Sequence, residues 1–274
     1  MIMNLARFFI VLLITVTIST AVPAQQIHLG VTTAMNATFV LDKGLSEDPR
    51  YSSQYTYNMA PVGFAFGVDF GRTFGLSLES ILSKQGQIYE IIDAAKQVRG
   101  QREISLSYVH LPLLMRFMSG GTGGARATFN LGPQLSVLTE AVENMHYEAG
   151  TFNIPEAADF QLPEGATDNG DGTYTTPSME PTEILTKEAN NFKNTEFQIA
   201  AAFGLDIDLA KHLFLSTQIR ANYSLTDMRT GDVIESIQNG EGGDLFGKRA
   251  NMLVGLQLGL HYTFGVTRSF KYKK

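Results

Sequence analysis

The chain has 274 residues, of which 44% are apolar and 18% are charged, and it contains no cysteine. This length suits one large domain or two modest ones, and the apolar content excludes an intrinsically disordered protein. The lack of cysteine excludes disulfides, thiolate metal sites and cysteine nucleophiles. The net charge of −6 argues against a nucleic-acid partner, because nucleic acid is bound by a basic face.

Residues 1–24 have the three parts of a secretory signal peptide. Arg7 supplies a positive charge, residues 8–18 form an apolar run broken only by threonines, and Val22 and Ala24 place small side chains before a cleavage point. The apolar run is about half the length of a membrane-spanning helix. The mature chain, 25–274, is therefore expected to be a single exported domain that is secreted, periplasmic or inserted as a β-barrel.

After the signal peptide, apolar residues alternate with small or polar ones, which is the period of a β-strand. The alternation predicts eight strands, at 26–39, 59–71, 73–86, 102–118, 124–139, 194–209, 213–226 and 250–264. Short connections alternate with long ones, the long ones being about 40–58, 87–101, 140–193 and 227–249. This asymmetry is typical of transmembrane barrels with short periplasmic turns and long outer loops. The sequence therefore predicts an all-β protein, an eight-stranded antiparallel up-and-down transmembrane barrel, followed by a basic tail at 265–274.

A soluble eight-stranded calyx with an apolar interior is the competing architecture. Such a barrel needs a charged, water-facing surface, whereas the residues between the apolar ones here are mostly Gly, Ala, Ser, Asn and Gln. Outward-facing apolar stripes with few charges are what a lipid-facing band requires. The pattern favours the membrane barrel.

An eight-stranded barrel is only wide enough for its own side chains to fill its interior, the lumen. On the predicted register the lumen receives Asp69, Glu79, His110, Arg116, Arg126, Glu196, Asp206, Asp208, Arg220 and His261. Both signs of charge are present, and an unpaired buried charge would be costly. We interpret the set as a structural ion-pair network, with a proton relay or a catalytic set as the alternative.

Residues 104–117, ISLSYVHLPLLMRF, resemble a strand of the PorT-like outer-membrane β-barrel family common in Bacteroidetes. Tyr108, Pro112, Leu113 and Arg116 occupy the positions that match the family pattern L-x-Y-L-x-I-P-L-L-x-K. Landmarks in the same order elsewhere include Ser83 to Gly86, the Asn-Leu-Gly-Pro run at 130–133 and His261 to Phe264. His110, where the family often has an acidic residue, and the tail after Phe264 depart from the pattern.

The resemblance implies an outer-membrane barrel without a defined reaction. The founding member of that family is linked to type IX secretion, so envelope or secretion-machinery proteins are the expected partners, besides outer-membrane lipid. The family supplies no catalytic residues, and no cofactor is expected. The motifs G-x-S-x-G, H-E-x-x-H and the P-loop are absent from the sequence. His28 and His146 are candidates for a site at the outer rim, but no nucleophile lies at a defined spacing from either.

The third long connection, 140–193, is strongly acidic. It carries eleven carboxylates and two lysines, a net charge of −9. Within it Asp168 and Asp171 invite a calcium interpretation, but their spacing differs from that of an EF-hand, and Asn-Gly and Asp-Gly favour tight hairpin turns. We expect a turn here and consider a metal site unlikely from this spacing. Overall the sequence predicts a non-catalytic envelope protein, with a small-solute pore as the second hypothesis.

Overall fold

The computed structural model describes residues 25–119, 124–156, 160–240 and 244–264. The expected signal peptide, 1–24, and the basic tail, 265–274, lie outside the described residues. Among the helices that are described, none has the length and hydrophobicity needed to cross a membrane.

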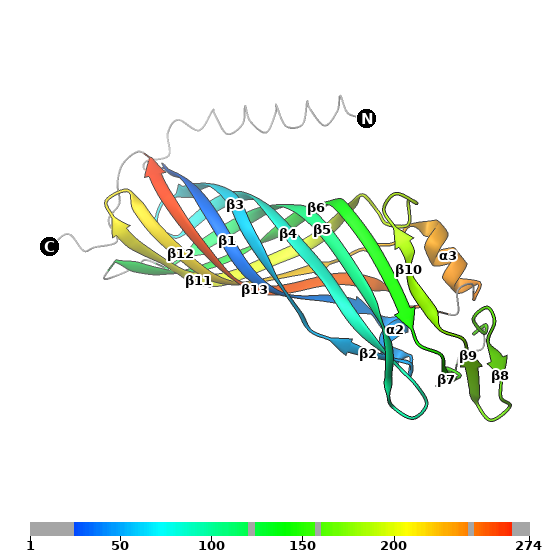
Figure 1. Cartoon of the computed structure of the whole chain (residues 1–274). Coiled ribbons are helices and arrows are strands. Elements are labelled where there is room, and N and C mark those ends of the chain that lie inside the picture. Colours follow the sequence, from blue (N-terminus) through cyan, green and yellow to red (C-terminus); the bar gives the residue numbers. More distant parts are fainter. Residues whose placement is uncertain (1–24, 120–123, 157–159, 241–243, 265–274) are drawn as a thin grey trace.

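Eight antiparallel strands form a closed ring (Figure 1). They are β1 (Gln25–Asp42), β3 (Thr56–Phe70), β4 (Phe74–Ile92), β5 (Val98–Met118), β6 (Ala125–Tyr147), β11 (Thr195–Ala210), β12 (Leu213–Ser224) and β13 (Arg249–Phe264). Each strand pairs with the next, and β13 pairs back with β1 from Ile27↔Phe264 to Asp42↔Arg249. The predicted fold class, an eight-stranded antiparallel barrel, is confirmed.

The outer end of the barrel carries further elements in place of unstructured loops (Figure 1). These are α2 (Lys43–Glu47), β2 (Tyr51–Gln54), β7 (Gly150–Asn153), β8 (Thr167–Asp168), β9 (Thr173–Thr176), β10 (Met179–Thr186) and α3 (Gly231–Gln238). The segment 87–101, expected as a loop, is mostly strand, because β4 and β5 continue as a hairpin whose turn is only 93–97. The backbone N–H of Gln97 donates to Asp93 Oδ1 at 2.8 Å, which stabilises this turn.

The opposite end has tight connections, as expected for the periplasmic side. Gly71, with φ +89°, makes the turn between β3 and β4, a conformation that favours glycine. Residues 211 and 212 join β11 to β12, and His212 Nδ1 lies 3.1 Å from the carbonyl oxygen of Thr263. His212 is thus half-buried.

Within the membrane-crossing part, apolar side chains face outward and polar ones inward. On β11, Phe203 is 60% exposed whereas its neighbour Ala202 is 4% exposed. Inward-facing glycines leave room for larger lumen groups: a Cβ at Gly30 would lie 2.3 Å from His261 Nδ1, and one at Gly67 would lie 2.1 Å from His28 Nε2. These glycines therefore admit two imidazole rings into a narrow lumen.

Farther out, the same positions still face inward and outward, but the chemistry of the two faces is exchanged. On β5 the buried residues beyond the apolar band are Ile104 and Leu106, while Glu103 and Ser105 are exposed. This pattern, apolar inside and polar outside, is that of a barrel in water. The outer portions of the long strands thus extend past the membrane and enclose an apolar core.

The barrel wall is irregular between β3 and β4. These strands pair only from Gly63↔Ile81 to Phe70↔Phe74, and farther out β4 pairs with β2. The hydroxyls of Thr38 and Thr56 both donate to the carbonyl oxygen of Gly86, at 3.1 and 3.0 Å. Side-chain donors thereby satisfy a backbone acceptor where strand pairing stops.

Candidate functional site

The lumen contains an ion-pair cluster nearest the periplasmic end. Arg116 Nη2 donates to Asp206 Oδ2 at 2.8 Å, and its Nη1 donates to Asp69 Oδ1 at 3.3 Å. Arg126 bridges the same two carboxylates, at 3.0 Å to Asp206 and 3.1 Å to Asp69. Two positive and two negative charges alternate, so each buried charge has partners of opposite sign. His28 joins this periplasmic-side network through contacts with Arg116 and, at 3.8 Å, with Asp69.

A second ion pair lies next along the lumen. Arg220 Nη1 donates to Glu79 Oε2 at 2.7 Å and to Gln257 Oε1 at 3.0 Å. Its other nitrogens donate to Gln134 at 3.0 Å and Asn222 at 3.1 Å. Every side chain in this Arg220 network is buried.

Glu196 sits in a third layer without an arginine among its described contacts. The hydroxyl of Tyr108 donates to Glu196 Oε1, Ser224 Oγ donates to Oε2 at 2.8 Å, and Asn251 Nδ2 donates to Oε1 at 2.9 Å. His110 stacks on Tyr108 with ring centroids 5.5 Å apart. The expected ion-pair network is therefore only part of the lumen, and this layer is held by neutral donors.

The remaining predicted lumen residues lie in the half of the barrel nearest the periplasm. His261 is buried, stacks on Phe214 at 4.6 Å, and its Nε2 lies 3.0 Å from Ser216 Oγ. Asp208 is only half-buried, at the last turn before the periplasm. His28, considered above as an outer-rim candidate, is instead 1% exposed inside the lumen, and that placement is corrected.

A small cavity adjoins His28, Ser216 and His261, but its volume of about 10 Å³ holds about one water molecule. The Ser216–His261 contact therefore lacks space for a substrate. His146 is exposed on the outer part of β6, far in sequence and in strand position from this contact. The described residues do not bring the candidate histidines together with a nucleophile in an open site.

Residues 104–117, which resemble the PorT-like strand, contribute side chains to different layers of the lumen. Tyr108 and Arg116 are both buried in the lumen, in the Glu196 layer and the periplasmic-side network respectively. Pro112 also points inward, whereas Leu113 faces outward and is 46% exposed. The motif residues thus build the barrel rather than one shared site.

Above the polar layers, an apolar cluster fills the outer part of the barrel. Its members come from several barrel strands, from α2 and from the outer connections: Val40, Leu45, Tyr89, Ile104, Leu106, Tyr108, Leu138, Ala141, Phe192 and Met228. The lumen is therefore filled by side chains from the periplasmic-side network to this cluster.

A buried cluster of charges, here called the mouth cluster, lies at the outer end of the barrel. Arg102 Nε donates to Glu143 at 2.5 Å, and its two terminal nitrogens hold Asp244 at 2.7 and 2.8 Å. Arg249 joins Glu143 and Asp42, each at 2.5 Å. Sequence reasoning missed these residues because Asp42, Glu143, Asp244 and Arg249 were assigned to loops and Arg102 stood at the very start of a predicted strand. The available signal was inward parity, because Arg102 precedes Ile104 by two residues on β5 and Arg249 precedes Asn251 by two residues on β13.

The mouth cluster fixes the last outer connection to the barrel. Burial raises the pKa of Asp244, but the charge of Arg102 outweighs this effect, so the pKa lies below its ordinary value. The pKa of Asp227 is also lowered: burial opposes the shift, and the hydrogen bond and charge of Arg229 overcome it. Asp227 and Asp244 are therefore ionised at neutral pH and hold Arg229 and Arg102, respectively.

The acidic segment 140–193 is largely folded in its described part. Asp168 Oδ1 accepts the N–H of Gly170 at 2.8 Å, and Asp171 Oδ1 accepts the N–H of Thr173 at 3.0 Å. Both carboxylates therefore stabilise the turn between β8 and β9. Across the described ranges, no group of three or more His, Asp or Glu side chains is arranged to hold a metal ion.

A cavity of about 820 Å³ opens between β10, α3 and the segment 161–164. Its volume falls within the range of small-ligand pockets, about 300–1,000 Å³. Apolar side chains from β10, α3 and the neighbouring connections line much of it. These include Met145, Leu162, Pro163, Pro177, Met179, Ile184, Val233 and Ile237. The charged side chains at the cavity are Arg102, Glu164, Asp232 and Asp244. Figure 1 shows β10 and α3 adjacent at the outer end.

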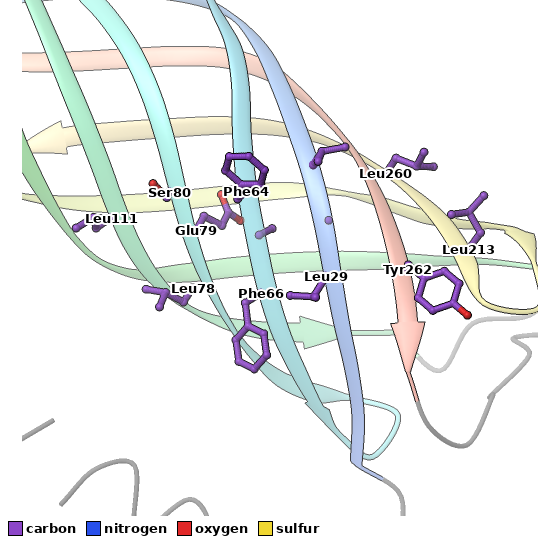
Figure 2. A pocket seen from close by; sticks show the side chains of 13 residues that line it. Leu29, Phe64, Phe66, Leu78, Glu79, Ser80, Leu111, Leu213, Leu260 and Tyr262 are labelled. Carbon is purple, nitrogen blue, oxygen red and sulfur yellow. The ribbon is translucent and has the colours of Figure 1, made fainter. Parts of the chain in front are cut away.

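A second hollow, of about 530 Å³, lies on the barrel wall (Figure 2). Leu29, Phe64, Phe66, Leu78 and Tyr262 surround it, and each of these side chains is exposed by 44% or more. The hollow therefore belongs to the outward apolar band and not to the lumen.

A closed antiparallel ring with an apolar outer band, a polar lumen and long outer connections defines an outer-membrane β-barrel. Residues 23–229 match the outer membrane protein beta-barrel domain, and the chain belongs to this family. The protein is thus located in the bacterial outer membrane, which excludes the soluble calyx. A search of the curated proteins found no significant match.

Solved structures with a similar architecture share little sequence with this chain. OprG of Pseudomonas aeruginosa is 11% identical, covering 88% of this chain and 96% of its own, with a TM-score of 0.37. Ail of Yersinia pestis, solved with a heparin analogue, is 9% identical, with coverages of 88% and 99% and a TM-score of 0.36. The outer-membrane protease OmpT of Escherichia coli is 10% identical, with coverages of 89% and 98% and a TM-score of 0.38. Similarities this low carry no inference about activity.

Proposed function

We propose that this protein is a non-catalytic component of the outer membrane that binds another protein through its outer elements. The supporting observation is the contrast between the two ends of the molecule. The lumen is filled by side chains, whereas the outer elements are folded, project beyond the membrane and form a cavity of about 820 Å³. A barrel built this way offers its outer elements as a binding surface, and its filled lumen leaves little space for the passage of solutes.

The filled lumen disfavours the alternative of a small-solute pore. Water-filled channels are generally formed by barrels with about twice as many strands. In planar bilayers we expect the purified protein to give no stable conductance. A large, steady conductance would contradict the proposal and favour the pore.

A more specific role accessory to protein secretion, of the type IX kind, is supported by the PorT-like strand alone. Tyr108 and Arg116, which match that pattern, stabilise the lumen through Glu196 and Asp206. Loss of secreted cargo from the cell surface on deletion of the gene, with restoration by the wild-type chain, would support this role. Unchanged secretion would limit the proposal to binding.

Site-specific photocrosslinking in intact cells tests the binding role directly. A photoreactive residue replaces Glu183, which is exposed on β10, and in a matched variant it replaces Arg72, which is exposed in a periplasmic turn. We expect a discrete protein adduct from position 183 and none from position 72. Adducts from position 72 only, or from neither position, would contradict the proposal.

A further inference from the structure

Among the described strands, β10 has a neighbour on one side only and so forms an edge of the barrel sheet. It pairs with β6 on one side, from Met179↔Tyr147 to Thr186↔Val142, and stands at the end of the strand order. The cavity described above separates it from α3, whose Val233 and Ile237 are buried and line the opposite wall. A sheet edge beside an open, partly apolar cavity has the geometry for adding an extended chain.

The two faces of β10 differ in chemistry. By register Met179 and Leu185 lie on the face of Tyr147 and Met145, and these four side chains line the cavity. Glu183 pairs with Asn144 on the opposite face and is exposed, and Glu180 is exposed at the first bulge of the strand. Successive residues of a strand point to opposite faces, and side chains on neighbouring strands pair across the same face. A chain added beside β10 would therefore place every second side chain among apolar groups and the others beside carboxylates.

Charge also determines which occupant fits. Asp232 and Glu164 at the cavity are exposed carboxylates, and Arg102 is already paired with Glu143 and Asp244. A second copy of β10 would bring its own glutamates against Glu180 and Glu183, and like charges placed opposite each other are destabilising. A basic chain meets no such repulsion.

We propose that the groove between β10 and α3 binds an extended peptide segment in which basic and aliphatic residues alternate, by adding it as a strand to β10. The inference rests on the proposed binding role of the outer elements and names the class of partner. The backbone of β10 holds the peptide, the aliphatic side chains enter the cavity, and the basic ones lie along Glu180 and Glu183.

Fluorescence anisotropy with the full-length protein in detergent micelles tests this proposal. The probe is a labelled nonapeptide of alternating Lys and Val. One comparison peptide has Glu in place of Lys, and another carries a backbone N-methyl group on every residue, which removes the backbone donors on both edges without changing charge. We expect saturable binding of the Lys–Val peptide only. The Glu–Val peptide carries the opposite charge, and the N-methylated peptide cannot form the strand hydrogen bonds.

Two matched protein variants separate the groove from general attraction to an acidic surface. Glu180→Gln with Glu183→Gln should weaken binding about fivefold, as expected for the loss of two exposed ion pairs. Glu188→Gln with Glu235→Gln removes the same charge from exposed positions outside the cavity and should change affinity by less than about twofold. A heat-dependent gel shift confirms that each variant is folded.

Equal binding of the N-methylated peptide would overturn strand addition, and equal effects of the two double variants would overturn the groove as the site. Absence of peptide binding together with a photocrosslinked adduct at position 183 would refute this inference alone. Absence of the adduct would refute the proposed binding role.

Discussion

Replacing Arg220 by methionine should strongly destabilise the barrel. Arg220 is 4% exposed, and it donates to Glu79, Gln257, Gln134 and Asn222. Methionine retains much of the side-chain volume but none of the donors. Glu79, 7% exposed, is then left with only the amide of Gln257, at 3.2 Å, among its described donors. Removing one partner of a buried ion pair costs about 3–5 kcal/mol.

Replacing the other partner of this ion pair, Glu79, should destabilise the barrel less. In Glu79→Gln, Arg220 keeps three amide oxygens as acceptors, so its charge remains partly solvated by the lumen. The double variant, Glu79→Gln with Arg220→Met, buries no unpaired charge. We therefore expect it to be more stable than Arg220→Met alone by about 1–3 kcal/mol, the penalty avoided for the uncompensated carboxylate.

Urea titration of the protein refolded in lipid vesicles measures these differences. The fraction of the heat-modifiable, folded band on gels serves as the readout, because the chain contains no tryptophan for fluorescence. A difference of about 3 kcal/mol corresponds to roughly a hundredfold change in the folding equilibrium. The reasoning is refuted if the double variant is no more stable than Arg220→Met, since the cost would then come from lost packing and not from the stranded charge.

Three further predictions follow from the lipid-facing band, the mouth cluster and the acidic connection. Phe203→Asp, which puts a charge into the lipid-facing band, should impair assembly by about 2 kcal/mol or more, whereas Ala202→Ser should leave the yield of folded protein unchanged; equal yields would reverse the facial assignment. The pKa of Asp244 is lowered, so its ion pair with Arg102 contributes stability above its ordinary pKa of 3.8 and loses it as the pH falls through the folded value. Cleavage near α3 by an acid-active protease should therefore accelerate below about pH 4 in the wild type, and Asp244→Asn should be cleaved readily at pH 5. Deleting residues 153–181 should leave the gel shift intact, because β6 and β11 pair directly, but abolish the adduct at Glu183; a lost gel shift would show that closure depends on this segment.

The alternation of β11 and β13 was sufficient to predict the barrel and its facing. Each outward side chain there is apolar over the whole membrane thickness, so strand period, face and environment agree. The placement of Arg116, Arg126 and Arg220 in the lumen follows from the same parity. Their individual partners do not, because partner choice depends on how far each strand is shifted against its neighbour.

The outer elements were predicted less well for a physical reason. The segment 87–101 was assigned to a loop because the apolar residues no longer lie on the outward face used for the rest of the chain. Glu196 shows a related limit: its hydrogen bonds come from Tyr108, Ser224 and Asn251 on three other strands. Neutral donors from distant strands give no charge pattern that a sequence could reveal.

The exchange of polar and apolar faces along β5 accounts for a folded outer end that can present the proposed binding surface. Between the periplasmic end and Val109, lipid covers the outside of the wall and polar contacts are needed inside. From Val109 toward the outer end, Glu103 and Ser105 face water while Ile104 and Leu106 pack inward. Burial of apolar side chains then supplies stability in the outer part, independently of the membrane. That second core can hold α3 and β10 against the mouth cluster while leaving their remaining edges open. A chain whose lumen is filled and whose strands nevertheless continue well past the bilayer has placed its adaptable surface outside the cell, where a partner can reach it.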